Sequence, residues 1–309
     1  MANTETKFYS LKNGITVTGI VILYLLISSL LIGFRNDQLI LATIFFICYF
    51  SSIVARKFII AFSIFIVYWI IFDYMKAFPN YAYNQVHLLQ LYVTEKALFG
   101  TMHNGVRLTP NEYWLAHTEI WMDVMSGLFY LCWMPFPLAF ATWLFFKDKN
   151  NFLQFSFTFL LVNLIGFIIY YSYPAAPPWY LQKYGAVFIS NSPGSSAGLQ
   201  RFDDYFNLDI FNSIYSRSSN VFAAMPSLHS SYPIIVLYYG IKRQMGWNNI
   251  VFAVVTMGIW FAAIYTSHHY VLDVLAGIAC ALAGIFIFQK VVMRSAAFNK
   301  FLHFYLSKI

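Results

Sequence analysis

The chain has 309 residues, of which 60% are hydrophobic and 21% aromatic, and its mean hydropathy is +0.62. Only 10% of its residues are charged, whereas soluble domains carry about 25%. This composition excludes an ordinary soluble domain and indicates an integral membrane protein. The net charge of +7 does not indicate a nucleic-acid partner, because the basic residues flank apolar runs, where they act as topology signals beside anionic lipid. The three cysteines lie inside apolar runs, at spacings typical of neither a metal site nor a disulfide framework.

Eight apolar runs could cross a bilayer as helices, which takes about 20 residues each. The sequence therefore predicts an all-α polytopic membrane helix bundle with about eight transmembrane helices, six of them in a catalytic core. The first run follows Lys7 and Lys12 and is longer than the apolar region of a signal peptide, so we expect a retained helix. The runs are 15–34, 38–55, 58–75, 120–146, 152–173, 226–241, 249–267 and 271–291.

Three units are expected along the chain. Residues 1–57 would form an N-terminal transmembrane hairpin, residues 58–291 a catalytic transmembrane domain, and residues 292–309 an amphipathic tail on the inner surface. The catalytic domain would carry two long outer loops, 76–119 and 174–225. The first contains amphipathic stretches that fit interfacial helices, and a polar loop as long as the second is usually functional or disordered.

The distribution of charge predicts the orientation in the membrane. If the N-terminus is cytoplasmic, the inner side receives most of the lysines and arginines but only Glu5 and Asp148 of the carboxylates, as the positive-inside rule requires. Both termini are then cytoplasmic. Two short polar segments, 225–230 and 268–273, fall on the outer face, which is periplasm in a bacterium or lumen in a eukaryote.

These polar segments contain the residues best suited to chemistry, because ionisable groups within membrane spans cost about 2.5–3.5 kcal/mol each on insertion scales. On a helix, His269 and Asp273 would share one face, where the carboxylate can orient the imidazole and raise its basicity. A neutral imidazole can attack phosphorus and form a phosphohistidine. The alternative is a capping histidine beside an aspartate that bonds a neighbouring helix.

His229 follows Pro226, which suits the first turn of a helix. The free amides of residues 227–229 would then favour an anion, and His229 could protonate a departing alkoxide. An ordinary histidine at a helix N-terminus is the alternative. Ser227 would be either a phosphate donor or a plain helix cap.

Two basic residues on the outer side could clamp phosphate oxygens. Lys76 lies at the outer end of the third run and Arg107 in the first loop; each could instead be an interfacial anchor that keeps its charge in water. His268 would point about 100° away from His269 on a helix, and no set of carboxylates and cysteines supports a metal, so we expect neither a metal nor another cofactor. Charged residues of the second loop could contact a polyol, although solvated loop charge is the simpler explanation: Arg201, Asp203, Asp204 and Arg217.

The two polar segments resemble the second and third motifs of the type 2 phosphatidic acid phosphatase superfamily, Pro-Ser-x-His and His-x-x-x-Asp. The resemblance covers roughly residues 65–290. It implies that His269 is the nucleophile, Asp273 its partner and His229 the acid on the leaving group, with Lys76 matching a basic residue of the first conserved segment. Segments that look more narrowly like the inositol phosphorylceramide synthase branch are 72–76, 98–100, 108–110, 173–179, 226–230 and 268–273.

The chain departs from the general superfamily pattern at the usual phosphate clamp. Ala262 and Ala263 stand where the superfamily has a serine and an arginine, and the Lys…Arg-Pro spacing of the first motif is absent. The resemblance therefore implies a membrane lipid phosphotransferase that moves a phosphoinositol head group from phosphatidylinositol to ceramide through a phosphohistidine and releases diacylglycerol. A lipid or polyprenyl phosphate phosphatase of the same superfamily is the alternative. A non-enzymatic membrane transporter is a third hypothesis, and the oligomeric state is left open.

Overall fold

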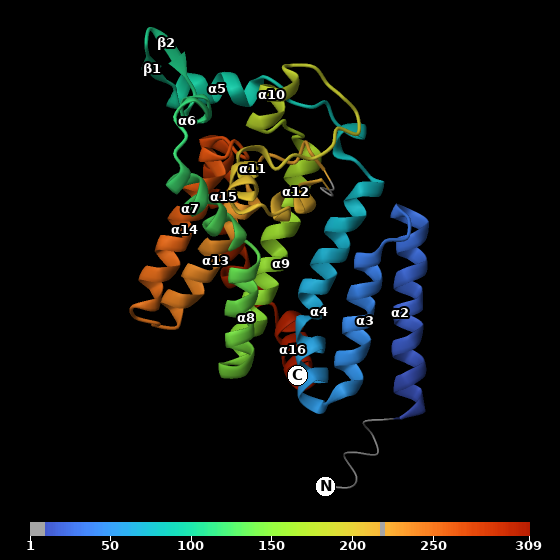
Figure 1. Cartoon of the computed structure of the whole chain (residues 1–309). Helices are drawn as coiled ribbons and strands as arrows, with labels where there is room; N and C mark the ends of the chain where they lie inside the picture. The colour runs from blue at the N-terminus through green and yellow to red at the C-terminus, as the bar shows by residue number, and fades with distance from the viewer. Residues whose placement is uncertain (1–9, 217–219) are drawn as a thin grey trace.

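The computed structural model describes residues 10–216 and 220–309 and shows an all-α bundle of roughly parallel helices (Figure 1). Every one of the eight apolar runs is helical, and one of them is a bent pair of helices. The corresponding elements are α2 (Leu11–Ile32), α3 (Asn36–Ser51), α4 (Ile53–Tyr74), α7 (Ile120–Leu131) with α8 (Pro135–Lys147), α9 (Lys149–Ser172), α13 (Leu228–Lys242), α14 (Asn248–Tyr265) and α15 (Val271–Lys290).

Length and composition identify five or six of the eight predicted crossings among the described residues. Five helices are long and apolar enough to cross a membrane alone, and the pair α7 and α8, bent by 41°, makes a sixth. The bend falls just before Pro135, which begins α8, because proline has no N–H with which to continue the preceding helix. With 16 and 15 residues, α3 and α13 fall short of a hydrocarbon core of about 30 Å at about 1.5 Å per residue.

The helices alternate in direction through the bundle. Figure 1 shows the start of α2 and the C-terminus at one end and the two long loops at the other. This alternation brings the starts of α13 and α15 to the end that carries the loops. The two predicted polar segments therefore lie at the same end of the molecule.

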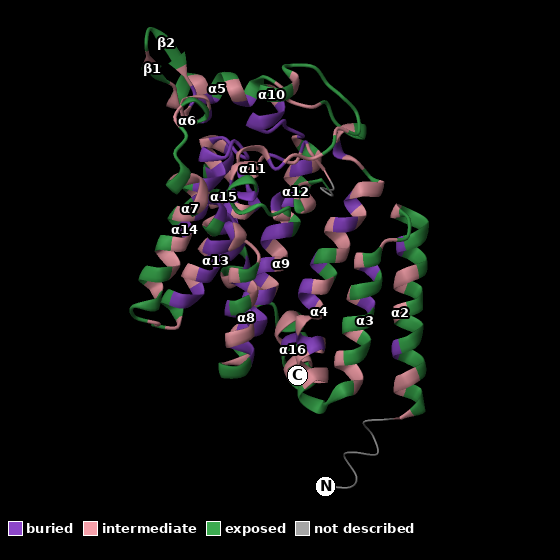
Figure 2. Cartoon of the chain, viewed as in Figure 1, coloured by how far each residue is buried: buried purple, intermediate pink, exposed green. Residues whose placement is uncertain are grey.

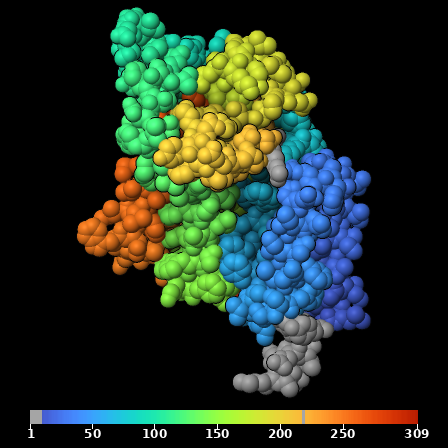
Figure 3. Space-filling model, viewed as in Figure 1, coloured from blue at the N-terminus to red at the C-terminus, as the bar shows by residue number. Residues whose placement is uncertain are grey.

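Short elements build the end that carries the loops, and Figure 3 shows the second loop lying over this end of the bundle. The helices expected in the first loop are present, but a small antiparallel hairpin between them was not expected. Its turn is formed by Asn104 and Gly105, with φ of 50° and 80°, the pair that a tight hairpin favours. The elements are η1 (Met75–Ala77), η2 (Asn80–Ala82), α5 (Gln90–Phe99), β1 (Thr101–His103), β2 (Val106–Leu108), α6 (Pro110–Ala116), α10 (Pro178–Tyr184), η3 (Ala197–Leu199), α11 (Gln200–Phe206) and α12 (Ile210–Tyr215).

The tail is helical, as expected, and it packs against the bundle. After the short η4 (Val292–Arg294), α16 (Ala296–Leu306) places aromatic rings against Phe157 of α9. The Tyr305 hydroxyl donates a hydrogen bond of 2.7 Å to the Ile60 carbonyl of α4. One side of this helix therefore packs against α4 and α9, with Leu302 buried, whereas Phe301 and Phe304 stay exposed.

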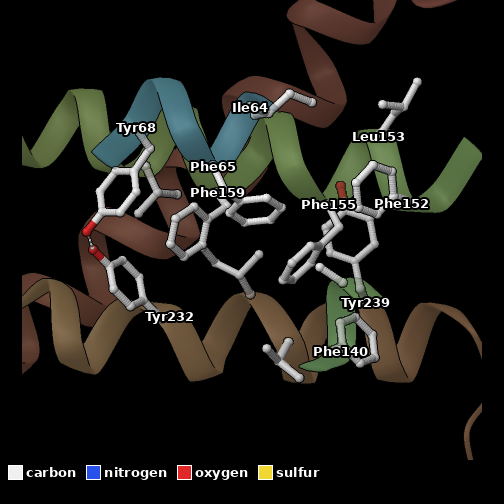
Figure 4. Packing of buried hydrophobic residues seen from close by; sticks show 14 of the residues in the cluster. Ile64, Phe65, Tyr68, Phe140, Phe152, Leu153, Phe155, Phe159, Tyr232 and Tyr239 are labelled. Carbon is white, nitrogen blue, oxygen red and sulfur yellow. Dashed lines mark hydrogen bonds between the residues drawn. The ribbon is translucent and has the colours of Figure 1, made fainter. Parts of the chain in front are cut away.

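The main hydrophobic core lies between α4, α8, α9, α13 and α15. Figure 2 shows the buried residues concentrated on α9 and α13, whereas α2 and α3 are largely exposed. Within this core the hydroxyls of Tyr68 and Tyr232 lie 3.0 Å apart (Figure 4), and Tyr232 donates to Asn163 Oδ1 at 2.6 Å. Buried polar groups cost free energy unless they are paired, so this network fixes the rotation of α13 three residues after His229.

Candidate active site

The starts of α13 and α15 contact each other through their backbones. The N–H of Ser227 donates to the carbonyl of Asp273 at 2.9 Å, and the Ser231 hydroxyl donates to the Gly277 carbonyl at 2.7 Å. Gly277 permits this approach, because a Cβ at that position would lie only 2.2 Å from the Ser227 carbonyl oxygen. Two segments that are 40 residues apart in the chain thus build one site.

The site is a connected row of polar side chains. His229 Nδ1 lies 3.3 Å from His269 Nε2, and His269 Nδ1 lies 3.5 Å from Asp273 Oδ2. The Tyr130 hydroxyl lies 3.4 Å from His229 Nδ1, and the Trp133 ring packs edge-on against the His229 ring at 4.5 Å. The two histidines are therefore close enough to act on one phosphorus, once it displaces their mutual contact.

His269 lies in a tight turn and not on a helix, which differs from the expectation of a shared helical face. Its N–H and that of His268 both donate to the Ala263 carbonyl, at 2.9 and 3.0 Å, and Ser267 closes the turn with φ of 60°. Because α15 begins at Val271, His269 approaches Asp273 from just outside the helix.

Asp273 has a structural task besides its pairing with His269. It is the third residue of α15, and its Oδ2 accepts a hydrogen bond of 2.9 Å from the N–H of Tyr270, the residue that caps the helix. Its side chain is fully buried. Its Oδ1 has no hydrogen-bond partner among the described residues, so a small rotation could close the 3.5 Å gap to the imidazole, and catalytic hydrogen bonds often tighten only when substrate binds.

The start of α13 also differs from the sequence expectation. Pro226 precedes the helix, Ser227 is its N-cap, and the helix begins at Leu228. The Ser227 N–H is used by Asp273, and its fully buried hydroxyl accepts from the N–H of Ser230. The structure therefore places Ser227 as a helix cap, one of the two roles considered for it, and not as a donor facing a ligand.

Two side chains from the first loop fix the segment that carries His269. The Glu95 carboxylate of α5 accepts the N–H groups of Val271 and Leu272 at 2.9 and 3.1 Å, which caps α15. The Asn111 amide of α6 donates to the carbonyls of Ile264 and His269 at 2.8 and 2.9 Å. Glu95 and Asn111 thus position the nucleophile candidate without touching its ring.

Burial shifts the pKa of His269, just before α15, and that of Glu95, the carboxylate of α5 that caps α15. It lowers the pKa of His269 to about 4, although the nearby Ala224 carbonyl opposes the shift. The imidazole is therefore neutral at neutral pH, as a nucleophile must be. Desolvation outweighs the gain in basicity that the sequence predicted from the carboxylate. Burial also raises the pKa of Glu95, against the two N–H groups that it accepts.

His229 of α13 opens into a cavity of about 300 Å³ that α4, α12 and the break between α7 and α8 also line. Aromatic rings form most of its wall, and ionisable side chains line the part formed by α4 and the α2–α3 connection. There Asp73 Oδ1 accepts from Arg35 Nη1 at 3.3 Å and from Lys76 Nζ at 3.2 Å. The lining residues are Arg35, Asp37, Tyr68, Trp69, Phe72, Asp73, Lys76, Trp133, Ile214, Tyr215 and His229.

The other predicted residues are more scattered. Arg107 lies on the exposed hairpin, where its guanidinium donates to the Ala97 carbonyl at 2.7 Å, and it does not line this cavity. The His268 ring contacts the Ser196 carbonyl at 2.9 Å, which is a structural role. Arg201 pairs with Asp123 at 2.6 Å.

Asp203 accepts the N–H groups of Phe211 and Asn212, and Asp204 accepts from Gln200; Arg217 lies outside the described residues. Within the described ranges, no group of three or more His, Cys, Asp or Glu side chains is arranged to hold a metal ion.

Sequence reasoning missed Arg35, Glu95 and Asn111. Arg35 carried a signal in the sequence, because a basic residue between the first two runs falls on the predicted outer side, where the positive-inside rule disfavours it. Glu95 was a carboxylate in an amphipathic stretch, and nothing in its neighbours indicated a cap 176 residues away. Asn111 sits inside the capping box of Thr109 and Glu112, a local motif that accounts for its surroundings without predicting its long-range contact.

Comparison with known proteins places the chain in a family. The model of the PAP2 superfamily matches residues 89–287. Phosphoinositol dihydroceramide synthase of Bacteroides thetaiotaomicron is 44% identical over 302 residues, which is 97% of this chain and 99% of that protein. Inositol phosphorylceramide synthase of Candida albicans is 32% identical over 173 residues, which is 52% of this chain and 36% of that protein.

No solved structure matches the chain significantly. The family model spans His229, His269 and Asp273, and the bacterial relative matches nearly the whole length of the chain. The protein therefore belongs to the PAP2 superfamily and, within it, to the branch of the inositol phosphorylceramide synthases.

Proposed function

We propose that this membrane protein transfers a phosphoinositol head group from phosphatidylinositol to the primary hydroxyl of a ceramide, through a phosphohistidine on His269. The observation that carries the proposal is the row His229–His269–Asp273 beside a cavity that also contains Lys76. This row supplies a neutral nucleophile, a partner for the charge that forms on it, and an acid for the leaving group. The names of the two relatives support the head group and the class of acceptor.

In the first half-reaction, His269 Nε2 attacks the phosphorus of phosphatidylinositol. The bond from phosphorus to the glycerol oxygen breaks, and protonated His229 gives its proton to that oxygen, which releases diacylglycerol. Asp273 stabilises the positive charge that the phosphorylated imidazole acquires. Lys76 stabilises the phosphate oxygens, where negative charge develops.

In the second half-reaction, the now neutral His229 removes the proton from the ceramide hydroxyl. The resulting oxygen attacks phosphorus, the bond from phosphorus to His269 breaks, and inositol phosphorylceramide leaves. His229 ends protonated and His269 unmodified, so the cycle returns every proton to its starting place. Water must be kept out between the two steps, since it would compete as acceptor, and the aromatic wall of the cavity suits this task.

The site is placed on the outer face in this proposal, with both termini in the cytoplasm. The charge bias of the sequence supports that orientation, and the start of α2 and the C-terminus lie at the end of the bundle opposite the site. Both lipids carry their reacting groups at the depth of the membrane interface. They can therefore reach the cavity laterally from the bilayer.

The test is a transfer assay with the purified protein and phosphatidylinositol labelled in the inositol ring. We expect labelled inositol phosphorylceramide and diacylglycerol only when ceramide or dihydroceramide is present, the latter because the bacterial relative is named for it. Equal release of label without an acceptor lipid, as inositol phosphate, would show that the protein hydrolyses its donor. Release of inorganic phosphate from a lipid phosphate would instead show a phosphatase.

A further inference from the structure

The cations of the His229 cavity come from the N-terminal part of the chain. Arg35 lies between α2 and α3, and Lys76 lies just after α4; both precede residues 89–287, which the family model matches. Within that region, Ala262 and Ala263 occupy the places of the superfamily's usual clamp, and both are fully buried and apolar. Without this N-terminal contribution, the described residues would supply the cavity with no cation other than histidine.

Arg35 is held firmly in the wall of the cavity. Its guanidinium bonds Asp73 at 3.3 Å through Nη1 and Asp37 at 2.9 Å through Nη2. Its side chain is 25% exposed and that of Lys76 is 22% exposed, so both charges are largely withdrawn from solvent. An arginine has five N–H donors in a planar fork, and two carboxylate contacts leave donors available for a ligand.

The backbone around Arg35 is also fixed. Gly33 turns the chain with φ of 80°, a conformation that glycine adopts without strain. Buried Gln38 accepts from the Arg35 N–H at 3.2 Å and donates to the Gly33 carbonyl at 3.1 Å. An Arg35 side chain that only had to keep its charge in water would not require an ordered connection between α2 and α3.

We propose that Arg35 is a further binding residue for the donor lipid, contacting its phosphodiester together with Lys76, so that the N-terminal hairpin completes the active site. The inference rests on the proposed function, and it adds a ligand contact that the family motifs lack. Asp73 holds the two cations at the wall of one cavity, and the carboxylate of Asp37 faces the same cavity. A carboxylate accepts hydrogen bonds only, so Asp37 suits the hydroxyls of a polyol such as inositol.

The competing role for Arg35 is to fasten the hairpin to α4. The structure offers a matched control for that role, because the Ser28 hydroxyl also links α2 to the end of α4, 2.9 Å from the Tyr74 hydroxyl. Ser28→Ala weakens the fastening without touching the cavity. Arg35→Lys keeps the positive charge but loses the planar set of guanidinium donors. It therefore tests the contact with the phosphodiester even if Arg35→Gln fails to fold.

Binding is measured first, with short-chain phosphatidylinositol and protein that also carries His269→Ala, so that no turnover occurs. We expect Arg35→Gln to raise the Kd about 10- to 100-fold, the effect of losing a charged hydrogen bond, and Arg35→Lys to raise it less. Ser28→Ala should lower the melting temperature and leave the Kd unchanged. An unchanged Kd in both Arg35 variants would overturn the inference.

Kinetics with intact His269 give the second readout. Arg35→Gln should raise the KM for phosphatidylinositol by a similar factor while kcat changes less than the KM does, whereas a hairpin that is merely loosened would lower the amount of active protein. The binding experiment does not depend on head-group transfer. The role proposed for Arg35 and the proposed transferase activity can therefore be contradicted independently. If Arg35 governs donor binding but the wild type makes no inositol phosphorylceramide, the proposed function fails alone.

Discussion

The proposed mechanism depends on His269 as the nucleophile, and the burial of this residue has a consequence for the pH dependence of the reaction. With a pKa lowered to about 4, only a few per cent of the imidazole is protonated at pH 5.5, whereas about nine-tenths would be at the usual pKa of about 6.5. We expect the single-turnover rate of phosphohistidine formation not to fall between pH 7 and pH 5.5. A fall of about tenfold would show that the nucleophile titrates near its ordinary pKa.

The catalytic assignment makes a graded prediction for three substitutions. His269→Ala should remove transfer by about 10³-fold or more, since no nucleophile is left. His229→Ala should slow it about 10²–10⁴-fold, the usual worth of a general acid and base, and Asp273→Asn should cost a comparable factor. Initial rates at saturating lipid measure all three, with the melting temperature of each variant as the control for folding.

Retention of wild-type transfer by His269→Ala would remove the assignment. If Asp273→Asn unfolds the protein, the loss of activity in that variant would report the role of Asp273 in capping α15 and not its role in the reaction. The hydrogen bond from the Tyr270 N–H to Asp273 makes this control necessary.

Among individual residues, the sequence pointed to the two histidines and the aspartate as candidates because ionisable side chains are rare in an apolar chain. It did not predict Glu95 or Asn111, whose partners are backbone groups. Backbone groups are present at every residue, so no side-chain pattern marks them. It also left two roles open for Ser227, because a helix cap and a phosphate donor require the same hydroxyl.

The close contact of α13 and α15 holds the two histidines together. Gly277→Ala would put a Cβ 2.2 Å from the Ser227 carbonyl oxygen, so the helix starts must move apart. We expect a loss of about 1–3 kcal/mol in stability, typical of overpacking, and a larger loss of activity than of folded protein. Gly19→Ala in α2 is the matched control, because its Cβ meets nothing within 4 Å.

Equal activity per folded molecule in Gly277→Ala and Gly19→Ala would show that the contact does not position the histidines. The measurement is the initial transfer rate divided by the concentration of folded protein, which gel filtration determines. Alanine favours a helix over glycine by about 1 kcal/mol, so Gly19→Ala should be neutral or slightly stabilising.

The carboxylate of Glu95 anchors the start of α15 from another element. Glu95→Gln replaces one acceptor oxygen with an amide donor that faces a backbone N–H, so we expect a loss on the order of 1–3 kcal/mol together with slower transfer. Glu119→Gln is the control, because Glu119 is exposed and makes no side-chain cap to its helix. Thermal melting in detergent and the initial rate measure the two effects. Identical behaviour of the two variants would contradict the anchoring role.

Helices were the predictable elements, since every apolar run is helical and only one of them is divided into two helices. Their ends were less predictable, because the ends depend on contacts between elements. Pro226 suits a first helical turn, yet Ser227 takes the cap once its N–H pairs with Asp273. The bend before Pro135 and the hairpin turn at Asn104 carried local signals that an apolar pattern alone does not reveal.

The whole molecule has a polar end that carries the candidate site and an opposite end that carries the start of α2 and the C-terminus. With the three native cysteines replaced, we expect a cysteine at exposed Asn104 in the hairpin to react with an impermeant maleimide in sealed right-side-out vesicles. A cysteine at exposed Asn248, the first residue of α14, should react only after the vesicles are opened. The reverse pattern would place the site on the cytoplasmic face.

The covalent intermediate gives the most direct test of the mechanism. The protein is mixed with phosphatidylinositol without ceramide, quenched in base, which preserves phosphohistidine, and digested for mass spectrometry. We predict an inositol phosphate adduct on His269 that ceramide removes as inositol phosphorylceramide and that is absent from His269→Ala. Full transfer activity with no adduct on His269, or with the adduct on another residue, would contradict the account.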